Sequence, residues 1–362
     1  MEAARPSPVP PAPDLRADAL APPRAGGPPP VRGVIRGRPE DFQVRERLRF
    51  APAGVGGHVY LRVRKRGVNT EWVARRLAAL AGVPARDVGY AGLKDRHAVA
   101  EQWFSLPCAG AEPDWGALAG EDVRVLEVTR HPRKLRRTAV AANAFSLTLR
   151  EVAGDQEALL RRGARLAARG APNYFGAQRF GRDGGNLERA ARLLAGALRP
   201  SRHLRGLYLS AARSALFNRV LAARVRAGTW CRILDGEILA LAGSRSRFRA
   251  RPEDEGLAPR LAAGDLHPTG PLWGRGGDRP EGACGALEGS ALAGLEFWCG
   301  GLEAAGLDYD RRPLRVIPGA WSLELEGDRV RLSFTLPAGA YATAVLRELA
   351  EVTDGALGPG RR

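Results

Sequence analysis

Two segments of alternating hydrophobicity lie near opposite ends of this chain, and helical patterns fill the residues between them. Residues 58–64 and residues 330–336 carry apolar side chains at every second position, which indicates strands buried on one face. Apolar side chains recur at helical intervals in residues 157–169, 186–198 and 211–227. Because a half-buried strand needs partners, this order predicts one sheet built from both ends of the chain, with a helix-rich module inserted between them.

Shorter patterns predict the remaining elements. Further strands are expected at residues 31–50, 102–106, 123–128, 144–152 and from residue 321 onward. Further helices are expected at residues 71–80, 287–304 and 342–352, and the Gly- and Pro-rich residues 267–285 are expected to form a loop. Strands and helices that are segregated in this way place the chain in the α+β class.

The N-terminal segment is rich in proline. Residues 1–32 contain 10 of the 27 prolines, and no apolar stretch follows a basic start as it would in a signal peptide. We therefore expect a disordered Pro-rich leader over residues 1–32 that takes no part in the fold.

The charge balance points to a polyanionic partner. Lys and Arg number 56 against 39 Asp and Glu, a net charge of +17, which favours nucleic acid through release of counterions. A membrane surface or an acidic protein would suit the same charge. No apolar run approaches the roughly 20 residues that cross a bilayer, so an integral membrane protein is excluded.

The densest basic run is RHPRKLRR at residues 130–137. It lies between two expected strands, so its side chains would be presented from a connecting segment. Its members Arg133, Lys134, Arg136 and Arg137 are candidates for contacts with RNA phosphates.

Motifs for metal and nucleotide chemistry are missing from the sequence. The four cysteines and five histidines are dispersed, without the spacing of a zinc site or a disulfide framework. There is no Walker A motif, no G-x-S-x-G and no H-E-x-x-H. We therefore expect no metal and no cofactor, and a reducing, cytoplasmic environment.

The most unusual local sequence is the Gly-rich segment VGYAGLKDRHAV at residues 88–99. It sets Asp95 between Lys94 and Arg96, and neighbouring cations favour the ionised carboxylate. Such a carboxylate could serve as a nucleophile or a base without a metal. A surface aspartate in a salt-bridged turn would have the same local sequence.

Aromatic and amide side chains stand near these charged segments. Phe42 follows two acidic residues, and Asn143 and Phe145 follow the basic run. Residues 173–186, which include Arg179, combine aromatic, Arg, Gly and amide side chains, a mixture that suits base stacking and phosphate contacts. Ordinary strand starts, core aromatics and a rigid interdomain loop would explain these patterns equally well.

Several of these segments resemble one known family, in its own order along the chain. GLKDRHAV at residues 92–99, followed by EQW, is similar to the catalytic loop of the TruD family of tRNA pseudouridine synthases. NYFGAQRFG at 173–181 and SAARSALFN at 210–218 resemble segments of that family's inserted domain. Matching motifs also occur at residues 39–42, 133–145 and 336–343, so the resemblance extends from about residue 34 to residue 353.

The resemblance implies a fold. A pseudouridine synthase catalytic domain with a mixed or antiparallel sheet is expected over residues 33–169 and 317–362. A helix-rich α/β TruD domain is expected as an insertion over residues 170–316.

The resemblance also implies an activity, the conversion of uridine to pseudouridine in tRNA, typically at position 13. Asp95 matches the catalytic aspartate, which acts as nucleophile at C1′ or as base at C2′. Phe42, Asn143 and Tyr341 match substrate-contacting positions, and Phe145 belongs to the same motif as Asn143. The cationic partner of Asp95 is expected to be Arg36 or, alternatively, Lys94. A monomer with tRNA as its partner, and no obligatory protein partner, is expected.

Two other functions remain open. A tRNA-binding or chaperone protein without catalysis would share the basic surface and the aromatic side chains. A metal-dependent nuclease could use Asp41, Asp95 and Asp183.

Overall fold

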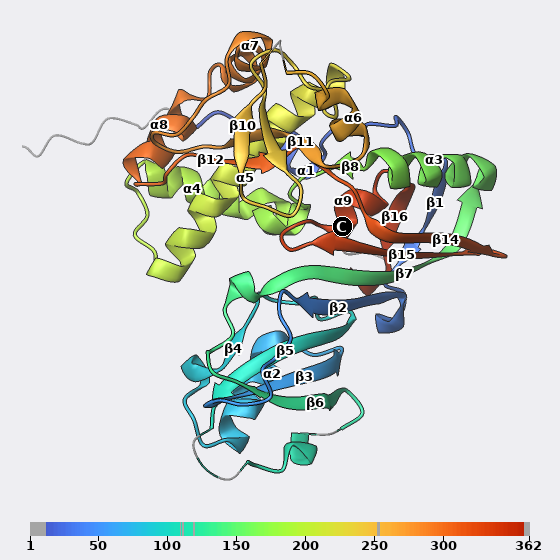
Figure 1. Cartoon of the computed structure of the whole chain (residues 1–362), viewed down its shortest axis with the longest axis vertical. Helices are drawn as coiled ribbons and strands as arrows, with labels where there is room; N and C mark the ends of the chain where they lie inside the picture. Colours follow the sequence, from blue (N-terminus) through green and yellow to red (C-terminus); the bar gives the residue numbers. More distant parts are fainter. Residues whose placement is uncertain (1–11, 109, 111, 119, 252–253, 358–362) are drawn as a thin grey trace, which may run out of the picture. The chain divides into compact units, whose positions relative to one another are not determined.

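A computed structural model describes residues 12–357 of the chain, except residues 109, 111, 119, 252 and 253. The described chain divides into two compact units (Figure 1). Unit 1 comprises residues 12–28, 168–317 and 343–348, and unit 2 comprises residues 29–167, 318–342 and 349–357. Unit 1 differs from the expected insertion, residues 170–316, chiefly in its N-terminal segment and in the short stretch 343–348.

Unit 2 is built on a mixed sheet with ten strands among its described residues. The strands are β1 (Val31–Ile35), β2 (Phe42–Leu48), β3 (His58–Arg66), β4 (Gly89–Tyr90), β5 (Val99–Pro107), β6 (Val123–His131), β7 (Val140–Gly154), β14 (Gly319–Glu326), β15 (Arg329–Pro337) and β16 (Ala350–Asp354). The order is β14-β15-β7-β2-β5-β3-β6, with β1 between β7 and β16 and with β4 beside β5. β2 is parallel to β5 and β1 to β16, whereas the other pairs are antiparallel. The expected α+β fold with a sheet shared by both ends of the chain is confirmed.

One face of this sheet has two parts. At β3, the inward-facing Val59, Leu61 and Val63 are buried against α2 (Thr70–Leu80), which contributes Val73 and Leu77. The register between strands places positions 44 and 46 of β2 on this same face, together with positions 143 and 145 of β7. The α2 half of this face therefore forms the core, and the β2–β7 half carries the candidate site described below.

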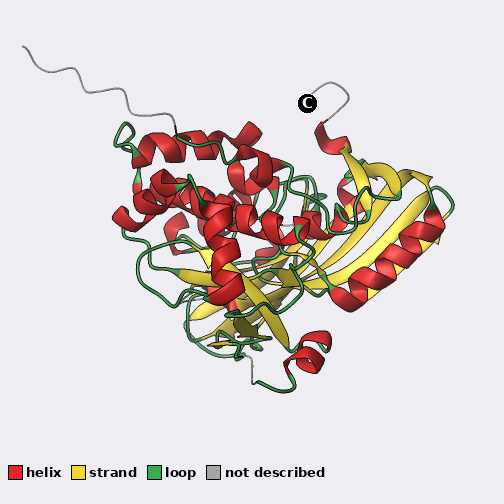
Figure 2. Ribbon diagram, turned by 90° about the horizontal axis from the view of Figure 1, so that it is seen from above, coloured by secondary structure: helices red, strands yellow, loops and turns green. Residues whose placement is uncertain are grey.

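A second helix of unit 2, α3 (Gln156–Arg169), lies along the strands at the other end of the sheet (Figure 2). Its Gly163 faces Leu323 of β14 so closely that a Cβ atom there would come within 2.8 Å of the leucine side chain. The glycine therefore permits the close approach of α3 to the sheet.

Unit 1 contains most of the helices. They are α1 (Arg16–Leu20), α4 (Gly185–Leu194), α5 (Arg202–Arg226), α6 (Leu257–Ala262), α7 (Gly282–Leu292), α8 (Glu296–Ala304) and most of α9 (Ala342–Leu346). Its described strands are β8 (Ala171–Pro172), β9 (Ile238–Leu241), β10 (Arg247–Arg249), β11 (Leu266–Leu272), β12 (Asp310–Pro313) and β13 (Arg315–Val316), in the orders β10-β9-β11-β12 and β13-β8. Short 3-10 helices along the whole chain are Pro39–Asp41, Ala85–Asp87, Trp115–Leu118, Arg137–Ala139, Ala177–Phe180, Arg182–Gly184 and Gly355–Leu357. The long helix α5 begins after Ser201, whose side chain accepts a hydrogen bond from the Leu204 N–H.

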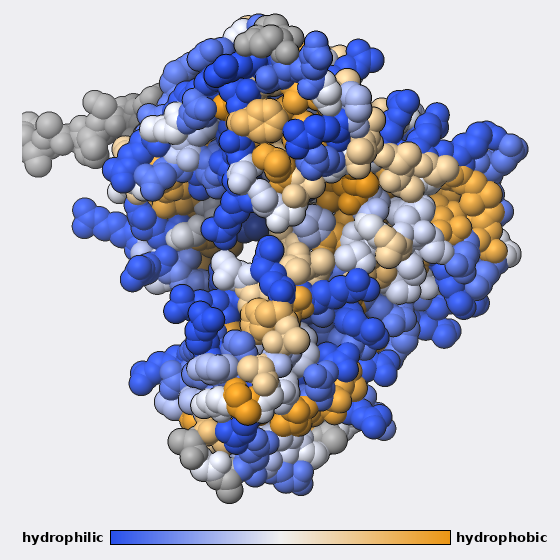
Figure 3. All heavy atoms as spheres, viewed as in Figure 1, coloured by the Kyte–Doolittle hydropathy of each residue, from blue (hydrophilic) through white to orange (hydrophobic). Residues whose placement is uncertain are grey.

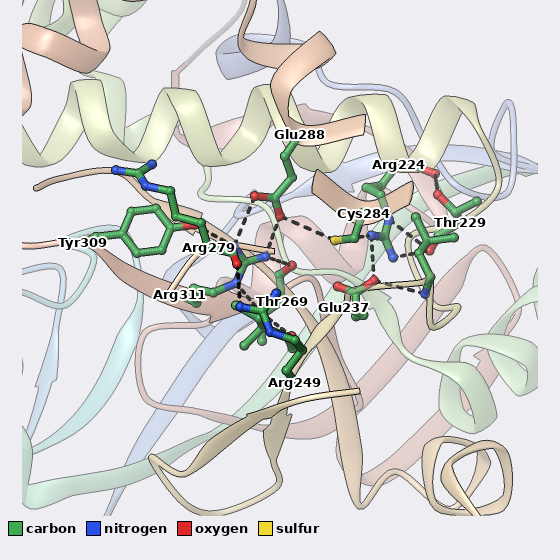
Figure 4. Close-up of polar contacts among 12 residues, drawn as sticks. Arg224, Thr229, Glu237, Arg249, Thr269, Arg279, Cys284, Glu288, Tyr309 and Arg311 are labelled. Atoms are coloured by element: carbon green, nitrogen blue, oxygen red, sulfur yellow. Dashed lines mark hydrogen bonds and ion pairs between the residues drawn. The ribbon is translucent and has the colours of Figure 1, made fainter. Parts of the chain in front are cut away.

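The core of unit 1 contains paired charges (Figure 4). Arg224 of α5 and Glu237 are both fully buried, and their charged groups lie 2.8 Å apart. Arg311 of β12 pairs with Glu288 of α7 and donates to the hydroxyl of Thr269 at 2.7 Å. Because each guanidinium is matched by a buried carboxylate, these charges fix how the helices meet the small sheet.

Part of the predicted leader belongs to the fold. Leu15 and Ala19 are buried, and Asp18 lies 2.8 Å from Arg219 and 2.6 Å from Arg226 of α5. The carbonyl of Pro13 accepts a hydrogen bond from Trp298 Nε1. The prediction of disorder is therefore wrong for the described residues 12–32, because a short apolar stripe and one ion-paired carboxylate hold residues 12–20 in unit 1. Residues 1–11 lie outside the described residues.

Other sequence predictions need correction in detail. The loop expected at residues 267–285 contains β11 and the start of α7, and the helix expected at residues 287–304 is two helices separated near Gly294, whose φ is +78°. The C-terminal helix expected at residues 342–352 ends at Leu346, and the chain then continues as β16. β16 pairs with β1, a partner so distant in sequence that local patterns cannot reveal it.

Candidate active site

The loop that carries Asp95, residues 91–98, joins β4 to β5 over the sheet face described above. The carbonyl of Gly92 accepts a hydrogen bond of 2.8 Å from the Gln102 side chain. Thr70 at the start of α2 donates to Gln102 Oε1 and accepts the Lys94 N–H, each at 3.0 Å. Gly92 has a φ of +79°, a conformation that favours glycine. The turn is therefore held on both sides by buried polar side chains.

Lys65 near the end of β3 holds the same loop in place through a hydrogen bond to its main chain. Its side chain is fully buried, and its Nζ donates to the main-chain carbonyls of Asp95 at 3.0 Å and Val68 at 2.8 Å. Burial lowers the pKa of Lys65 to about 8, although the nearby negative charge of Asp95 opposes this shift. The contact fixes the position of the Asp95 backbone.

The carboxylate of Asp95 has two described partners. One oxygen accepts the N–H of His97 at 3.0 Å, and the other forms an ion pair with the guanidinium of Arg36. Arg36 also donates to Asp354 at the end of β16, with a hydrogen bond of 3.1 Å from Nε and an ion pair from the guanidinium. The planar guanidinium therefore connects two carboxylates that come from distant parts of the sequence.

The backbone of Arg36 is strained. Its φ is +58°, in the left-handed region, which disfavours residues with a side chain by roughly 1–2 kcal/mol. The ion pairs with Asp95 and Asp354 hold the side chain in this arrangement. Strain of this kind is concentrated at functional sites.

Lys94 does not share the role of Arg36. Its Nζ lies 2.8 Å from Glu46 Oε1 and donates to Asn143 Oδ1 at 2.9 Å. Glu46 is buried on β2, and a carboxylate in that environment needs a positive partner. The ion-pair partner of Asp95 is therefore Arg36, and the alternative of Lys94 in that role is wrong.

Aromatic rings lie next to these charges on the sheet. The Phe42 and Phe145 rings meet edge to face with centroids 6.1 Å apart, and the Arg36 guanidinium lies 5.7 Å from the centre of the Phe42 ring. Phe42 is buried, whereas Phe145 is only half-buried. Tyr341, also half-buried, follows β15 and precedes α9. Unit 2 thus brings Arg36, Phe42, Lys94, Asp95, Asn143 and Phe145 together.

The basic run reaches the surface of unit 2 as the sequence predicts. Leu135 is buried and its N–H donates to Ser105 at 2.8 Å, which anchors the run to β5. The four candidate side chains of the run are exposed: Arg133, Lys134, Arg136 and Arg137. On the face drawn in Figure 3, hydrophilic residues predominate and hydrophobic residues form small separate patches.

Two further candidates have other surroundings. Arg179 belongs to unit 1, where its guanidinium lies 5.6 Å from the Phe175 ring centre and donates to Ser210 at 3.3 Å. Asp41 is buried and forms an ion pair of 2.7 Å with Arg150. Within the described residues, no three His, Cys, Asp or Glu side chains are grouped as metal ligands.

Sequence reasoning missed Glu46, Lys65 and Asp354. Glu46 and Lys65 each occupy an inward position in an alternating strand, after apolar residues at the preceding inward positions. A charge at such a position is a signal that could have been noticed, since it needs a buried partner. No comparable signal marks Asp354, which reaches Arg36 only through the pairing of β16 with β1.

Comparison with known proteins identifies the family. The family model described as tRNA pseudouridine synthase D (TruD) matches residues 25–196 and 184–349. The chain is 50% identical over 334 residues to the tRNA pseudouridine synthase D of Nitrosococcus oceani, covering 91% of this chain and 93% of the relative. It is 51% identical over 332 residues to that of Methylococcus capsulatus, covering 91% and 94%. The chain belongs to the tRNA pseudouridine synthase D family. The family and the enzyme class expected from the sequence are thereby confirmed.

A solved structure supports the fold. The crystal structure of a candidate tRNA pseudouridine synthase D (TruD) from Methanosarcina mazei matches with a TM-score of 0.70, covering 93% of this chain and 98% of that chain at 22% identity. The TruD fold is therefore shared although most residues differ. None of the helices in the described part of this TruD family member is long and apolar enough to cross a membrane.

Proposed function

We propose that this protein isomerises uridine to pseudouridine in tRNA, at position 13, with Asp95 as the catalytic residue. The observation that carries the proposal is the ion pair between Asp95 and Arg36. Asp95 belongs to a loop whose sequence matches the family's catalytic motif. The pair lies beside the Phe42 ring, which contacts Phe145 on the same sheet face.

The reaction requires only groups that this site supplies. The bond between N1 and C1′ breaks, the uracil turns, and a bond forms between C5 and C1′. The proton lost from C5 is balanced by the proton that N1 gains, so no redox partner or transferred group takes part. Asp95 acts on the ribose, as nucleophile at C1′ or as base at C2′, and Arg36 forms the ion pair that holds its carboxylate in place.

Binding must expose the target nucleotide. A uridine inside folded tRNA has to be flipped out before a carboxylate can reach its sugar. The rings of Phe42 and Tyr341 then hold the extruded base by stacking. The exposed run at Arg133, Lys134, Arg136 and Arg137, together with Arg179, contacts phosphates. The protein acts as a cytoplasmic monomer, without an obligatory protein partner.

Release of tritium from C5 of uridine tests the proposal. Unmodified tRNA transcripts labelled at C5 are incubated with the wild type, Asp95→Asn and the control Asp122→Asn, each with and without chelator. Asp122 suits the control because it is also paired with an arginine, Arg66, but is half exposed and outside the loop. We expect release by the wild type and the control, no release by Asp95→Asn, and no effect of chelator.

Other outcomes point to the alternatives. Absence of release by a folded wild type that binds tRNA would favour an RNA-binding protein without catalysis. Strand cleavage that chelator abolishes would favour the nuclease. A transcript with cytidine at position 13 tests the target, and undiminished release from it would place the modified uridine elsewhere.

A further inference from the structure

We infer that Glu46 and Lys94 are positioning residues that orient the side-chain amide of Asn143, so that its Nδ2–H group is presented to a carbonyl oxygen of the target uracil. This inference rests on the proposed function. It assigns a role to the buried carboxylate of Glu46 on β2, a residue outside the motifs that resemble the family.

The three side chains meet at one place on the sheet. Glu46 and Asn143 are directly opposite each other in the antiparallel pair β2–β7. The Lys94 side chain comes from the loop that carries Asp95, and its Nζ is 2.8 Å from Glu46 Oε1 and 2.9 Å from Asn143 Oδ1. The second oxygen of Glu46 accepts the Trp103 N–H at 2.9 Å. Glu46 is thus fixed by β5 and in turn fixes Lys94.

The orientation of the Asn143 amide follows from the chemistry of Lys94. An ammonium group has donors and no acceptor, so the amide atom that faces it must be the carbonyl oxygen. The other end of the amide, Nδ2, is therefore directed away from Lys94. Asn143 is half-buried, so part of the residue remains accessible on the site face.

A fixed N–H donor that faces C4 of the base would distinguish uracil from cytosine. Uracil has carbonyl oxygens at C2 and C4, whereas cytosine carries an amino group at C4, which would leave two donors facing each other at that position. If the amide could rotate, its oxygen would also be presented, and the preference would weaken. Discrimination by an unpaired donor can be large because the mismatch leaves a desolvated polar group without a partner.

A double-mutant cycle tests whether Glu46 acts through Asn143. We would measure kcat/KM for C5 tritium release by the wild type, Glu46→Gln, Asn143→Ala and the double variant, with the melting temperature and tRNA affinity of each. The Glu46→Gln change keeps an acceptor for the Trp103 N–H while removing the charge that holds Lys94. We expect each single change to lower kcat/KM about tenfold, the size of one lost hydrogen bond, and the double variant to equal Asn143→Ala.

Additive losses in the cycle would overturn the inference, because they would show that Glu46 acts independently of Asn143. Glu288→Gln is a matched control, since Glu288 is a buried glutamate that pairs with Arg311 in unit 1. Its effect should add to that of Asn143→Ala. If Glu46→Gln does not fold, the double change Glu46→Gln/Lys94→Met removes both charges of the pair, and this variant takes the place of Glu46→Gln in the same cycle.

An NMR measurement on the Asn143 amide, which does not depend on catalytic turnover, tests this inference separately from the proposed function. The chain contains five asparagines, so selective ¹⁵N labelling resolves the Asn143 amide, which is assigned by its loss in Asn143→Ala. We expect ¹⁵N relaxation to show a rigid side-chain amide in the wild type and a more mobile one in Glu46→Gln. Equal mobility in the two proteins would refute the inference even if tritium release succeeds, and failure of release by the wild type with different mobilities would refute only the proposed function.

Discussion

Lys65 donates a hydrogen bond from its Nζ to the main-chain carbonyl oxygen of Asp95, 3.0 Å away. The lysine lies at the end of β3 and is fully buried, whereas the aspartate belongs to the loop before β5. A buried ammonium that binds the backbone of the proposed catalytic residue leaves the Asp95 carboxylate free to meet Arg36.

Replacing Lys65 should impair turnover more than binding. Lys65→Met keeps the length of the side chain but leaves the Asp95 carbonyl without this donor, so we expect kcat to fall about tenfold while tRNA affinity changes little. Single-turnover tritium release and filter binding check both quantities. Lys134→Met, on the exposed basic run, is the control and should change affinity rather than kcat.

The buried Lys65 should also make stability depend on pH. Its folded pKa of about 8 lies below the unfolded value of roughly 10.4, so the unfolded chain binds more protons between these values. The free energy of unfolding of the wild type should therefore rise, relative to that of Lys65→Met, as the pH increases from about 8 toward 10. Urea denaturation of both proteins across this range measures the difference, and a constant difference would contradict the expected shift.

The forked guanidinium of Arg36 should not be replaceable by an ammonium. Arg36→Lys keeps the charge but cannot reach Asp95 and Asp354 with the same planar set of donors. We expect Arg36→Lys to retain part of the activity and Arg36→Met to lose about a hundredfold in kcat/KM, the loss of a charged hydrogen bond. Asp354→Asn, which keeps Asp95 intact, should have the smallest effect in tritium-release assays, and a larger loss there than in Arg36→Met would overturn this assignment.

The basic run should contribute to tRNA affinity through charge. Arg133→Glu/Arg136→Glu should weaken binding and lower the slope of log K against log salt, by roughly 0.7–0.9 for each phosphate contact removed. Titrations at several salt concentrations measure the slope. Arg329→Glu changes an exposed arginine on β15 and is the control. An unchanged slope in the double variant would show that the basic run does not contact tRNA phosphates.

Removing one partner of the buried ion pair in unit 1 should destabilise the protein more than removing both partners. Arg224→Met leaves the buried Glu237 without its cation and should lower the free energy of unfolding by about 3–5 kcal/mol. Arg224→Met/Glu237→Gln removes both charges and should recover part of that loss. Chemical denaturation of the three proteins checks the order, and a double variant less stable than Arg224→Met would contradict it.

Local patterns in the sequence were sufficient for the strands and helices whose apolar residues repeat regularly. The alternation at Val59, Leu61 and Val63 predicted β3, and the helical spacing within residues 157–169 predicted α3. The motif around Asp95 identified the family, because a long, contiguous match does not depend on knowing the fold. These signals are local, and each can be recognised within about one turn or strand of the chain.

The tertiary structure decided which charges meet. Arg36 contacts Asp95 and Asp354, and Lys94 contacts Glu46 and Asn143, although these residues come from strands and a loop that are far apart in sequence. The same reason explains β16, which pairs with β1, and the ordered residues 12–20, which are held by α5 and Trp298. Such contacts depend on register and burial, which a local pattern does not contain.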